Sequence, residues 1–400
     1  MKAIEGGVTT PKGFRAAGVS AAIKPNSTKR DCALIASDAT ASVAGTFTTN
    51  LFKAPPVQWN EYVCTLGRAR AVFVNSGNAN ACTGDPGYAD ARTTAGWVAQ
   101  GLDAAEDEVC ICSTGVIGVR LPMQRIETGV RQCLESLSKD GGGDAARAIM
   151  TTDTVPKEAA FELELDGKIV RLGAIAKGAG MISPNMATMI CVVTTDAAVE
   201  PPVLSRLLKQ AVHVSFNRVC VDNDMSTSDT LLCLANGQSG VAVTPDSAAC
   251  AVFAEALTAL CQKMAQWLVR DGEGATKFVE IAVSGAANDE DAKTIARSIA
   301  VSQLCKTAFF GQDPNWGRFA CAAGYAGVPF DVTEFQLWIE DVQLVKDGQV
   351  AEYLEADAAA CMLKPEFRIR LSVGGGPGSA VYWTSDLSHD YVTINADYRT

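Results

Sequence analysis

The sequence predicts an α/β protein in which sheets and helices pack in layers, with a second, smaller α+β domain in its last third. Strand-like and helix-like stretches alternate along the whole chain, as expected of a layered enzyme and not of an all-helical or all-β protein. Hydrophobic residues make up 48% of the 400 positions, enough for a large core, and a chain of this length favours two or so domains. There is no internal repeat and no low-complexity tract.

The first hundred residues are predicted to form strands separated by turns, of which 33–38 (ALIASD) and 71–75 (AVFVN) are the clearest. The turn SGNANACTG follows, ahead of a helix over 88–101. Its clustered backbone donors could hold an anion, although a well-capped turn explains the motif more simply. It lacks GxGxxG, so no dinucleotide site is predicted.

A strand, VCICST, then runs into Gly115 and precedes an amphipathic helix over 121–137. GGGD at 141–144 is interpreted as a surface turn. Residues 161–177 form a hairpin, because Asp166-Gly167 is a strong type I′ turn signal.

In the second half, helices are predicted after the Pro201-Pro202 pair, from Asp246-Ser247 to about 270, and over 289–305. A strand separates the last two helices. Residues 335–351 and 367–386 are interpreted as hairpins of the smaller domain. A shift in composition places the boundary after residue 286, which gives domains 1–286 and 287–400.

The formal charge of −11 and the pI near 4.8 argue against nucleic acid and anionic membrane surfaces as partners. The start of the chain, MKAIEGGVTTPKGF, has no apolar core. No stretch approaches the roughly 18 apolar residues of a membrane span. We therefore expect a cytoplasmic protein.

Metal and histidine chemistry are not expected. The fourteen cysteines are scattered singly, which is typical of reduced core residues, and the CxC pair lacks a second pair for zinc. Asp222, Asp224 and Asp229 lie close together in sequence but fail the EF-hand spacing. The two histidines, His213 and His389, have no nucleophile motif nearby.

The stretch KGAGMISPNMATMICVVTTD, residues 177–196, joins a glycine-containing loop to a buried strand predicted over 189–195. Thr188 lies at the junction. A hydroxyl in this place is expected of a nucleophile that becomes a new chain terminus. Its Oγ would attack the carbonyl carbon of Ala187, and the freed α-amine, with a pKa near ~8, would serve as its general base. On the pattern alone, a strand start with a capped turn is the commoner explanation.

Within that stretch, the residues KGAGMISPNMATM resemble the processing site of the ornithine acetyltransferase (glutamate N-acetyltransferase) family of arginine biosynthesis. The resemblance covers almost the whole chain through VNSGNANACTG, STGVIG, TTDT, GEGATK, GQDPNWGR and the terminal NADYRT. It implies an N-terminal-nucleophile-like αββα sandwich. It also implies self-cleavage between Ala187 and Thr188, with the two fragments intertwined and assembled two of each as a heterotetramer.

The resemblance also assigns roles to single residues. Thr188 would be the nucleophile, while the Thr114 hydroxyl and the Gly115 N–H would hold the oxyanion. Substrate-binding positions would be Thr151, Lys177, Thr188, Glu273, Asn395 and Thr400. Considered singly, Lys177 is equally well explained as a solvated surface charge. A solvated turn acid is the preferred explanation of Glu273, and a frayed end explains the C-terminal residues. The chain departs from the family pattern at Asn223, Met225 and Ser228, which puts a substrate role for that loop in doubt.

The implied reaction transfers an acetyl group from N2-acetylornithine to glutamate. It demands no organic cofactor and no metal, and a bifunctional member would also accept acetyl-CoA as a co-substrate. Three alternatives stay open: an amidase or aminopeptidase of the same fold, a non-catalytic binding protein that keeps an intact chain, and a family branch acting in secondary metabolism.

Overall fold

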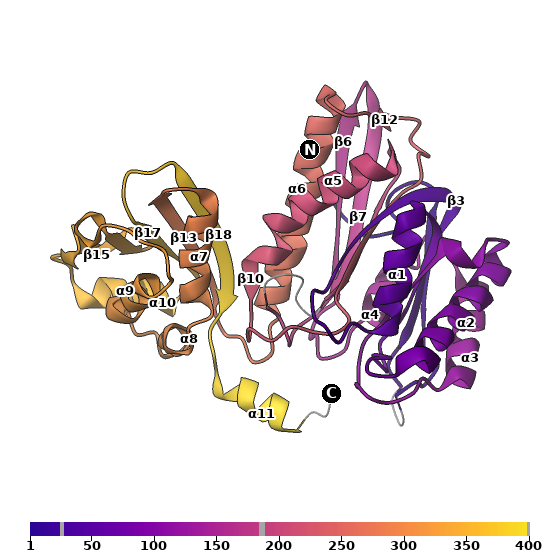
Figure 1. The fold of residues 1–400 in the computed structure, drawn as a ribbon, viewed down its shortest axis with the longest axis horizontal. Helices are drawn as coiled ribbons and strands as arrows, with labels where there is room; N and C mark the ends of the chain where they lie inside the picture. The colour runs from indigo at the N-terminus through magenta and orange to yellow at the C-terminus, as the bar shows by residue number, and fades with distance from the viewer. Residues whose placement is uncertain (25–27, 184–188, 398–400) are drawn as a thin grey trace.

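The computed structural model describes residues 1–24, 28–183 and 189–397. Within these residues the chain forms a larger domain around a nine-stranded sheet and a smaller domain around a seven-stranded sheet (Figure 1). The two domains lie side by side. A final helix leads from the smaller domain back beneath the larger one.

The larger sheet has the order β1-β6-β7-β8-β11-β3-β4-β5, with β2 paired to β3. Its strands are β1 (Lys2–Ile4), β2 (Phe14–Val19), β3 (Cys32–Phe47), β4 (Arg68–Asn75), β5 (Val109–Ser113), β6 (Lys157–Leu165), β7 (Lys168–Lys177), β8 (Ile190–Thr195) and β11 (Thr230–Ala235). The long strand β3 pairs with β4 on both sides of a register shift between Ala36 and Ala41. Its first part also pairs with β2, and its last part, from Ser42 on, pairs with β11.

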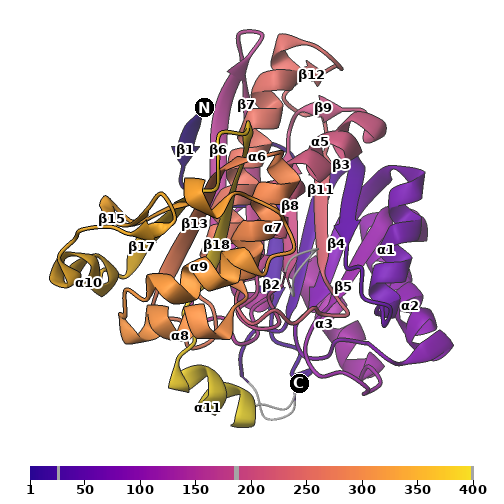
Figure 2. The ribbon, with the colours of Figure 1, turned by 60° about the vertical axis from the view of Figure 1, so that its left-hand side comes forward.

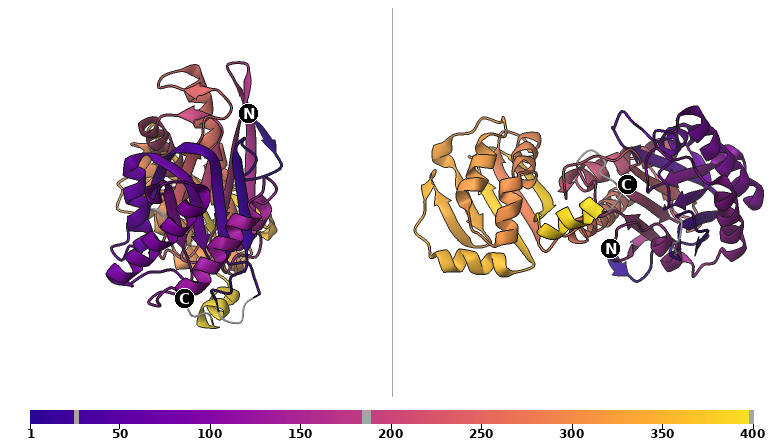
Figure 3. Two further views of the ribbon diagram at one scale, coloured as in Figure 1. Left: turned by 90° about the vertical axis from the view of Figure 1, so that its right-hand side faces the viewer. Right: turned by 90° about the horizontal axis from the view of Figure 1, so that it is seen from below.

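Both faces of this sheet are buried. Successive residues of β8 alternate between two cores, with Cys191 and Val193 in one and Ile190 and Val192 in the other. Helices α5 (Pro201–His213) and α6 (Ala248–Arg270) cover the first core. The second core is covered by α1 (Pro55–Leu66), α2 (Gly84–Leu102), α3 (Met123–Ser136) and α4 (Gly142–Ala148), on the other side of the sheet (Figure 3). Continuous apolar strands are what a sheet covered on both faces requires.

The smaller sheet has the order β10-β18-β13-β17-β14-β15-β16. Its strands are β10 (Val219–Cys220), β13 (Phe278–Ala286), β14 (Gln336–Ile339), β15 (Val342–Lys346), β16 (Gln349–Val350), β17 (Glu366–Ser372) and β18 (Gly378–Ser385). The accompanying helices are α7 (Asp289–Ala300), α8 (Gln303–Gly311), α9 (Trp316–Gly324) and α10 (Glu355–Leu363). Two short strands, β9 (Ala198–Val199) and β12 (Ala242–Val243), pair separately, and α11 (His389–Asp397) projects from the end of β18 (Figure 2).

The predicted α/β class with a second, smaller domain is confirmed. The hairpin over 161–177 is formed by β6 and β7, and Asp166 and Gly167 have φ angles of 50° and 72°, as a type I′ turn requires. Helix α6 begins after Ser247, whose side chain accepts a hydrogen bond from the Cys250 amide. All fourteen cysteines are free thiols and ten are buried, as expected of reduced core residues.

Three local predictions were wrong. Helix α1 lies in the stretch predicted as strands and turns, and its Pro55 and Pro56 occupy the first helical turn, where proline is favourable. The helix predicted over 289–305 is two helices, since Ser302 caps a new one. Gly141 and Gly142 are buried at the start of α4, where a Cβ on Gly141 would lie 1.9 Å from the Ala16 carbonyl oxygen.

The hairpin predicted over 367–386 is also wrong, because β13 lies between its two strands. β13 is parallel to β17 and antiparallel to β18. The connection between them passes beside the end of β13, where the Gly376 amide donates to the Gly285 carbonyl at 3.1 Å. The smaller sheet therefore contains two strands, β10 and β13, that lie on the N-terminal side of the boundary predicted after residue 286.

By length and composition α6 is apolar enough to cross a membrane, contrary to the expectation from the sequence. It is the single such helix among the residues that the structure describes. Half of its most apolar window is buried inside the protein, where Phe253, Leu257 and Leu260 join the first core. Helices in a protein core share these properties.

Candidate active site

One pocket gathers six of the predicted site residues at the junction of the two domains. Its cavity volume is about 60 Å³, and the pocket is open to solvent. Its lining comes from the end of β5, the loop after α4, the end of β7, the loop after α6, and α11. The predicted residues that line it are Thr114, Gly115, Thr151, Lys177, Glu273 and Asn395, and Ser226, Thr227 and Ser228 join them.

Thr114 and Gly115 directly follow β5. The Thr114 amide donates to the Asn75 carbonyl at 3.0 Å, which extends the pairing of β5 with β4 by one residue. Gly115 has a φ of 132°, and a Cβ there would lie 2.8 Å from the Asn78 nitrogen. Only glycine fits this turn, so the Thr114 hydroxyl and the Gly115 backbone belong to adjacent residues that line the pocket.

Lys177 is the last residue of β7, and its side chain is buried, with only 2% of the residue exposed. Its Nζ donates to the Thr114 Oγ1 at 3.4 Å. Burial lowers the pKa of Lys177, and the nearby Asp153 carboxylate opposes that shift. The interpretation of Lys177 as a solvated surface residue is therefore wrong.

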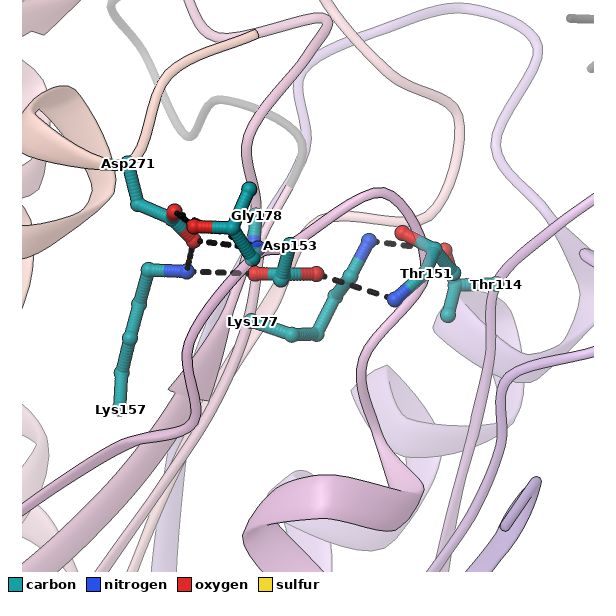
Figure 4. A network of polar contacts seen from close by, with 8 residues as sticks. Thr114, Thr151, Asp153, Lys157, Lys177, Gly178 and Asp271 are labelled. Carbon is teal, nitrogen blue, oxygen red and sulfur yellow. Dashed lines mark hydrogen bonds and ion pairs between the residues drawn. The ribbon is translucent and has the colours of Figure 1, made fainter. Parts of the chain in front are cut away.

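Asp153 accepts three hydrogen bonds beside Lys177 (Figure 4). Its Oδ1 accepts from Lys157 Nζ at 2.6 Å and from the Gly178 amide at 2.7 Å, and its Oδ2 accepts from the Thr151 amide at 3.0 Å. Burial would raise the pKa of Asp153, but Lys177, Lys157 and the Gly178 amide together hold it below its usual value.

Lys157 is fully buried and has a second partner, Asp271, whose Oδ2 lies 2.5 Å from its Nζ. Asp271 follows α6 and also accepts from the Thr154 amide and hydroxyl. Sequence reasoning missed Asp153, Lys157 and Asp271. The one available signal was the motif TTDT, whose third residue is Asp153.

Glu273 lies on the loop after α6, where the Asn395 Nδ2 donates to its Oε2 at 2.9 Å. The Glu273 amide donates to the Ala179 carbonyl at 2.9 Å, which fixes this loop against the segment after β7. Gly180 allows the approach, because a Cβ there would lie 2.4 Å from the Glu273 Oε2. The C-terminal helix α11 therefore forms part of the pocket through Asn395.

Two further carboxyl groups lie near the pocket. Asp222 accepts from the Met181 amide at 2.7 Å, and burial raises its pKa to about 6. Asp229 is fully buried, its Oδ1 accepts from the Met189 amide at 3.1 Å, and its Oδ2 has no hydrogen-bond partner among the described residues. Burial raises the pKa of Asp229 well above its usual value. In the part of the chain that the structure describes, no group of three side chains is placed to hold a metal ion.

Three predicted positions, Ala187, Thr188 and Thr400, lie outside the described residues. The strand predicted after Thr188 is present as β8, which begins at Ile190. The two histidines do not line the pocket: His213 pairs with Glu290 at 3.1 Å, and His389 packs edge-on against Phe310.

The chain matches known proteins over nearly its full length. The ArgJ family model matches residues 15–400. The arginine biosynthesis bifunctional protein ArgJ of Geobacter sulfurreducens is 50% identical over 391 residues, which cover 97% of this chain and 99% of that protein. The ArgJ protein of Symbiobacterium thermophilum is 47% identical over 402 residues and the full length of both chains.

A solved structure agrees with these matches. The crystal structure of ArgJ from Bacillus halodurans is 37% identical, superimposes with a TM-score of 0.51, and covers 52% of this chain and 98% of that one. The motifs that line the pocket, STGVIG, TTDT and GEGATK, fall within the matched range. A family match that includes the pocket and extends to the last residue leaves one conclusion: the chain belongs to the ArgJ family.

Proposed function

We propose that this ArgJ family enzyme cleaves its own backbone between Ala187 and Thr188 and then uses Thr188 to transfer an acetyl group from N2-acetylornithine to glutamate. The observation that carries the proposal is the pocket itself. It combines a buried ammonium group, an accessible carboxylate and a hydroxyl beside a glycine amide, at the end of the strand that leads to residue 188. These groups match the charges of an amino acid and the needs of acyl transfer.

In the proposed cleavage, the Thr188 Oγ attacks the Ala187 carbonyl carbon. The bond from that carbon to the Thr188 nitrogen breaks, the nitrogen takes up a proton, and an ester joins Ala187 to the Oγ. Water then hydrolyses the ester, which leaves an Ala187 carboxylate and a Thr188 that has both a hydroxyl and a free α-amine.

In the proposed transfer, the α-amine accepts the hydroxyl proton as the Oγ attacks the acetyl carbonyl of N2-acetylornithine. The Thr114 hydroxyl and the Gly115 N–H stabilise the oxyanion, and ornithine leaves with the proton on its α-amine. Glutamate then attacks the acetyl ester by its own α-amine, which returns the Oγ to a hydroxyl and gives N-acetylglutamate. Lys177 would bind a substrate carboxylate, and Glu273 would bind the ornithine side-chain amine.

Neither step uses a metal or an organic cofactor. The word "bifunctional" in the names of the relatives supports a second acetyl donor, for which we propose acetyl-CoA as a co-substrate. We also propose a cytoplasmic heterotetramer of two front and two back fragments, without nucleic acid or membrane partners, in keeping with the net charge of −11.

A denaturing gel and a donor assay test the proposal together. Purified protein should run as two fragments, and N2-acetylornithine with glutamate should give equal amounts of ornithine and N-acetylglutamate. Acetate in place of N-acetylglutamate would support an amidase instead. An intact 400-residue chain without activity would support a binding protein.

Asn395 tests the contribution of α11. Replacing it with alanine should lower kcat/KM about tenfold or more, because a hydrogen bond to a charged group contributes about 1.5–3 kcal/mol and this one orients Glu273. The thermal midpoint should not change, since Asn395 is exposed. A chain that ends at Ile394, and so lacks Thr400 as well, should lose still more activity with the same stability.

Thr393→Ala is the matched control, because among the described residues the Thr393 hydroxyl bonds within α11, to the His389 carbonyl. It should behave as wild type in the same assay. Equal activity of the Asn395→Ala variant and the wild type would show that Asn395, and with it α11, has no role in the reaction.

A further inference from the structure

We propose that Asp153 is a positioning residue for the carboxylate-binding part of the pocket: through Lys177, Gly178 and Thr151 it sets the charge and the geometry with which the pocket receives a substrate carboxylate. This inference rests on the proposed function, which assigns the carboxylate to Lys177. It assigns a role to a residue that has no contact with substrate in that mechanism.

The geometry supports a positioning role. Asp153 holds the amides of Thr151 and Gly178 with its two different oxygens, at 3.0 and 2.7 Å. Thr151 lines the pocket on one side, and Gly178 follows Lys177 directly (Figure 4). A single carboxylate therefore fixes the backbone on both sides of the buried ammonium group.

The charges point the same way. Among the described residues, the charges that act on the pKa of Lys177 are those of Asp153, Lys157, Asp229 and Glu273. Asp153 acts on the pKa of Lys177 more strongly than Asp229 or Glu273 does, and Glu273 already accepts a hydrogen bond from Asn395. Asp153 is thus the main counter-charge that offsets the burial of Lys177, whereas the Lys157 ammonium acts against it.

Lys157 and Asp271 hold the Asp153 side chain in position. Lys157 bridges the two carboxylates at 2.6 and 2.5 Å and has no exposed surface, so the three side chains hold one another in place. Asp271 lies two residues before Glu273 in the same loop. The network consequently joins the three segments that carry Thr151, Lys177 and Glu273.

The test is the pH dependence of kcat/KM for glutamate. Lys177 must be charged to bind a carboxylate, so activity should fall as the pH rises through its pKa. Asp153→Asn removes the counter-charge, which should move this alkaline limb to lower pH and reduce kcat/KM about tenfold or more at pH 9, with recovery as the pH is lowered. Lys157→Gln removes a like charge, which should move the limb to higher pH.

The Lys177→Gln variant identifies the group that titrates, because it should abolish the alkaline limb. Thermal unfolding of each variant shows whether it is folded. A structural role alone would not shift the limb in opposite directions for Asp153→Asn and Lys157→Gln. Shifts in the same direction, or an unmoved limb in folded Asp153→Asn, would overturn the inference.

A second measurement separates this inference from the proposed function. Protein labelled with ¹³C at lysine Cε reports the titration of Lys177 by NMR without any turnover, and Lys177→Gln assigns the signal. The Lys177 titration should move to lower pH in Asp153→Asn and to higher pH in Lys157→Gln. If the wild-type protein transferred no acetyl group but these shifts were observed, the proposed function would be wrong and the effect of Asp153 on Lys177 would be supported. If the protein transferred acetyl groups but the Lys177 titration did not shift, the effect of Asp153 on Lys177 would be ruled out.

Discussion

Replacing Thr188 with alanine is expected to leave a single polypeptide of 400 residues without acetyl transfer activity. The variant lacks the oxygen that would attack the Ala187 carbonyl, so the chain cannot be cut by the proposed route. It therefore also lacks the α-amine that would act as general base. Loss of both groups should lower kcat by roughly 10⁴-fold or more, as for the nucleophile of other covalent acyl-transfer enzymes. Intact-mass spectrometry and the ornithine release assay measure the two effects separately.

Thr188→Ser is the control, because it keeps a hydroxyl at the same position. It should be cut and should turn over more slowly than wild type. Two fragments from the alanine variant would contradict the proposed cleavage, as would a wild-type preparation that is uncut across residues 187 and 188 and yet fully active.

Elements with strong local signals could be predicted from the sequence. The hairpin of β6 and β7 follows from Asp166-Gly167, whose φ angles favour these two residues, and α6 follows from the cap at Ser247 and a long apolar stripe. The smaller sheet could not be predicted in the same way. Pairing of β17 and β18 with each other was the local expectation, whereas insertion of β13 depends on a strand about 90 residues earlier in the chain.

The pocket also contains some residues that could be identified from the sequence and others that could not. Thr114, Gly115 and Lys177 line the pocket and lie at strand ends in short motifs, and the resemblance of those motifs to the family is what identified them as site residues. The ion pair between Lys157 and Asp271 joins residues 114 positions apart, and no local pattern connects them. Lys157 is the first residue of an otherwise ordinary amphipathic strand, and its burial becomes evident only when the loop after α6 packs against it. Burial and the choice of ion-pair partner depend on the tertiary structure, so buried charge networks cannot be predicted from local sequence patterns.

Replacing Thr114 with alanine is expected to slow both self-cleavage and turnover. One oxyanion donor contributes about 3 kcal/mol to the transition state, so kcat should fall by roughly 10²- to 10³-fold, and cleavage should be slowed because it passes through the same kind of oxyanion. Thr114→Ser keeps the hydroxyl and should retain most activity. Gel analysis of freshly expressed protein measures the cleavage, and steady-state kinetics measure the turnover.

The effects of the Thr114→Ala substitution on kcat and on KM distinguish an oxyanion donor from a residue that acts through carboxylate binding. Its hydroxyl also accepts from the Lys177 Nζ at 3.4 Å, so alanine could act by disturbing carboxylate binding instead. Disturbed binding would raise the KM for glutamate with kcat nearly unchanged, and it would not slow cleavage, which involves no substrate carboxylate. A fall in kcat together with slow cleavage therefore identifies an oxyanion donor, and unchanged kinetics for both would remove Thr114 from the mechanism.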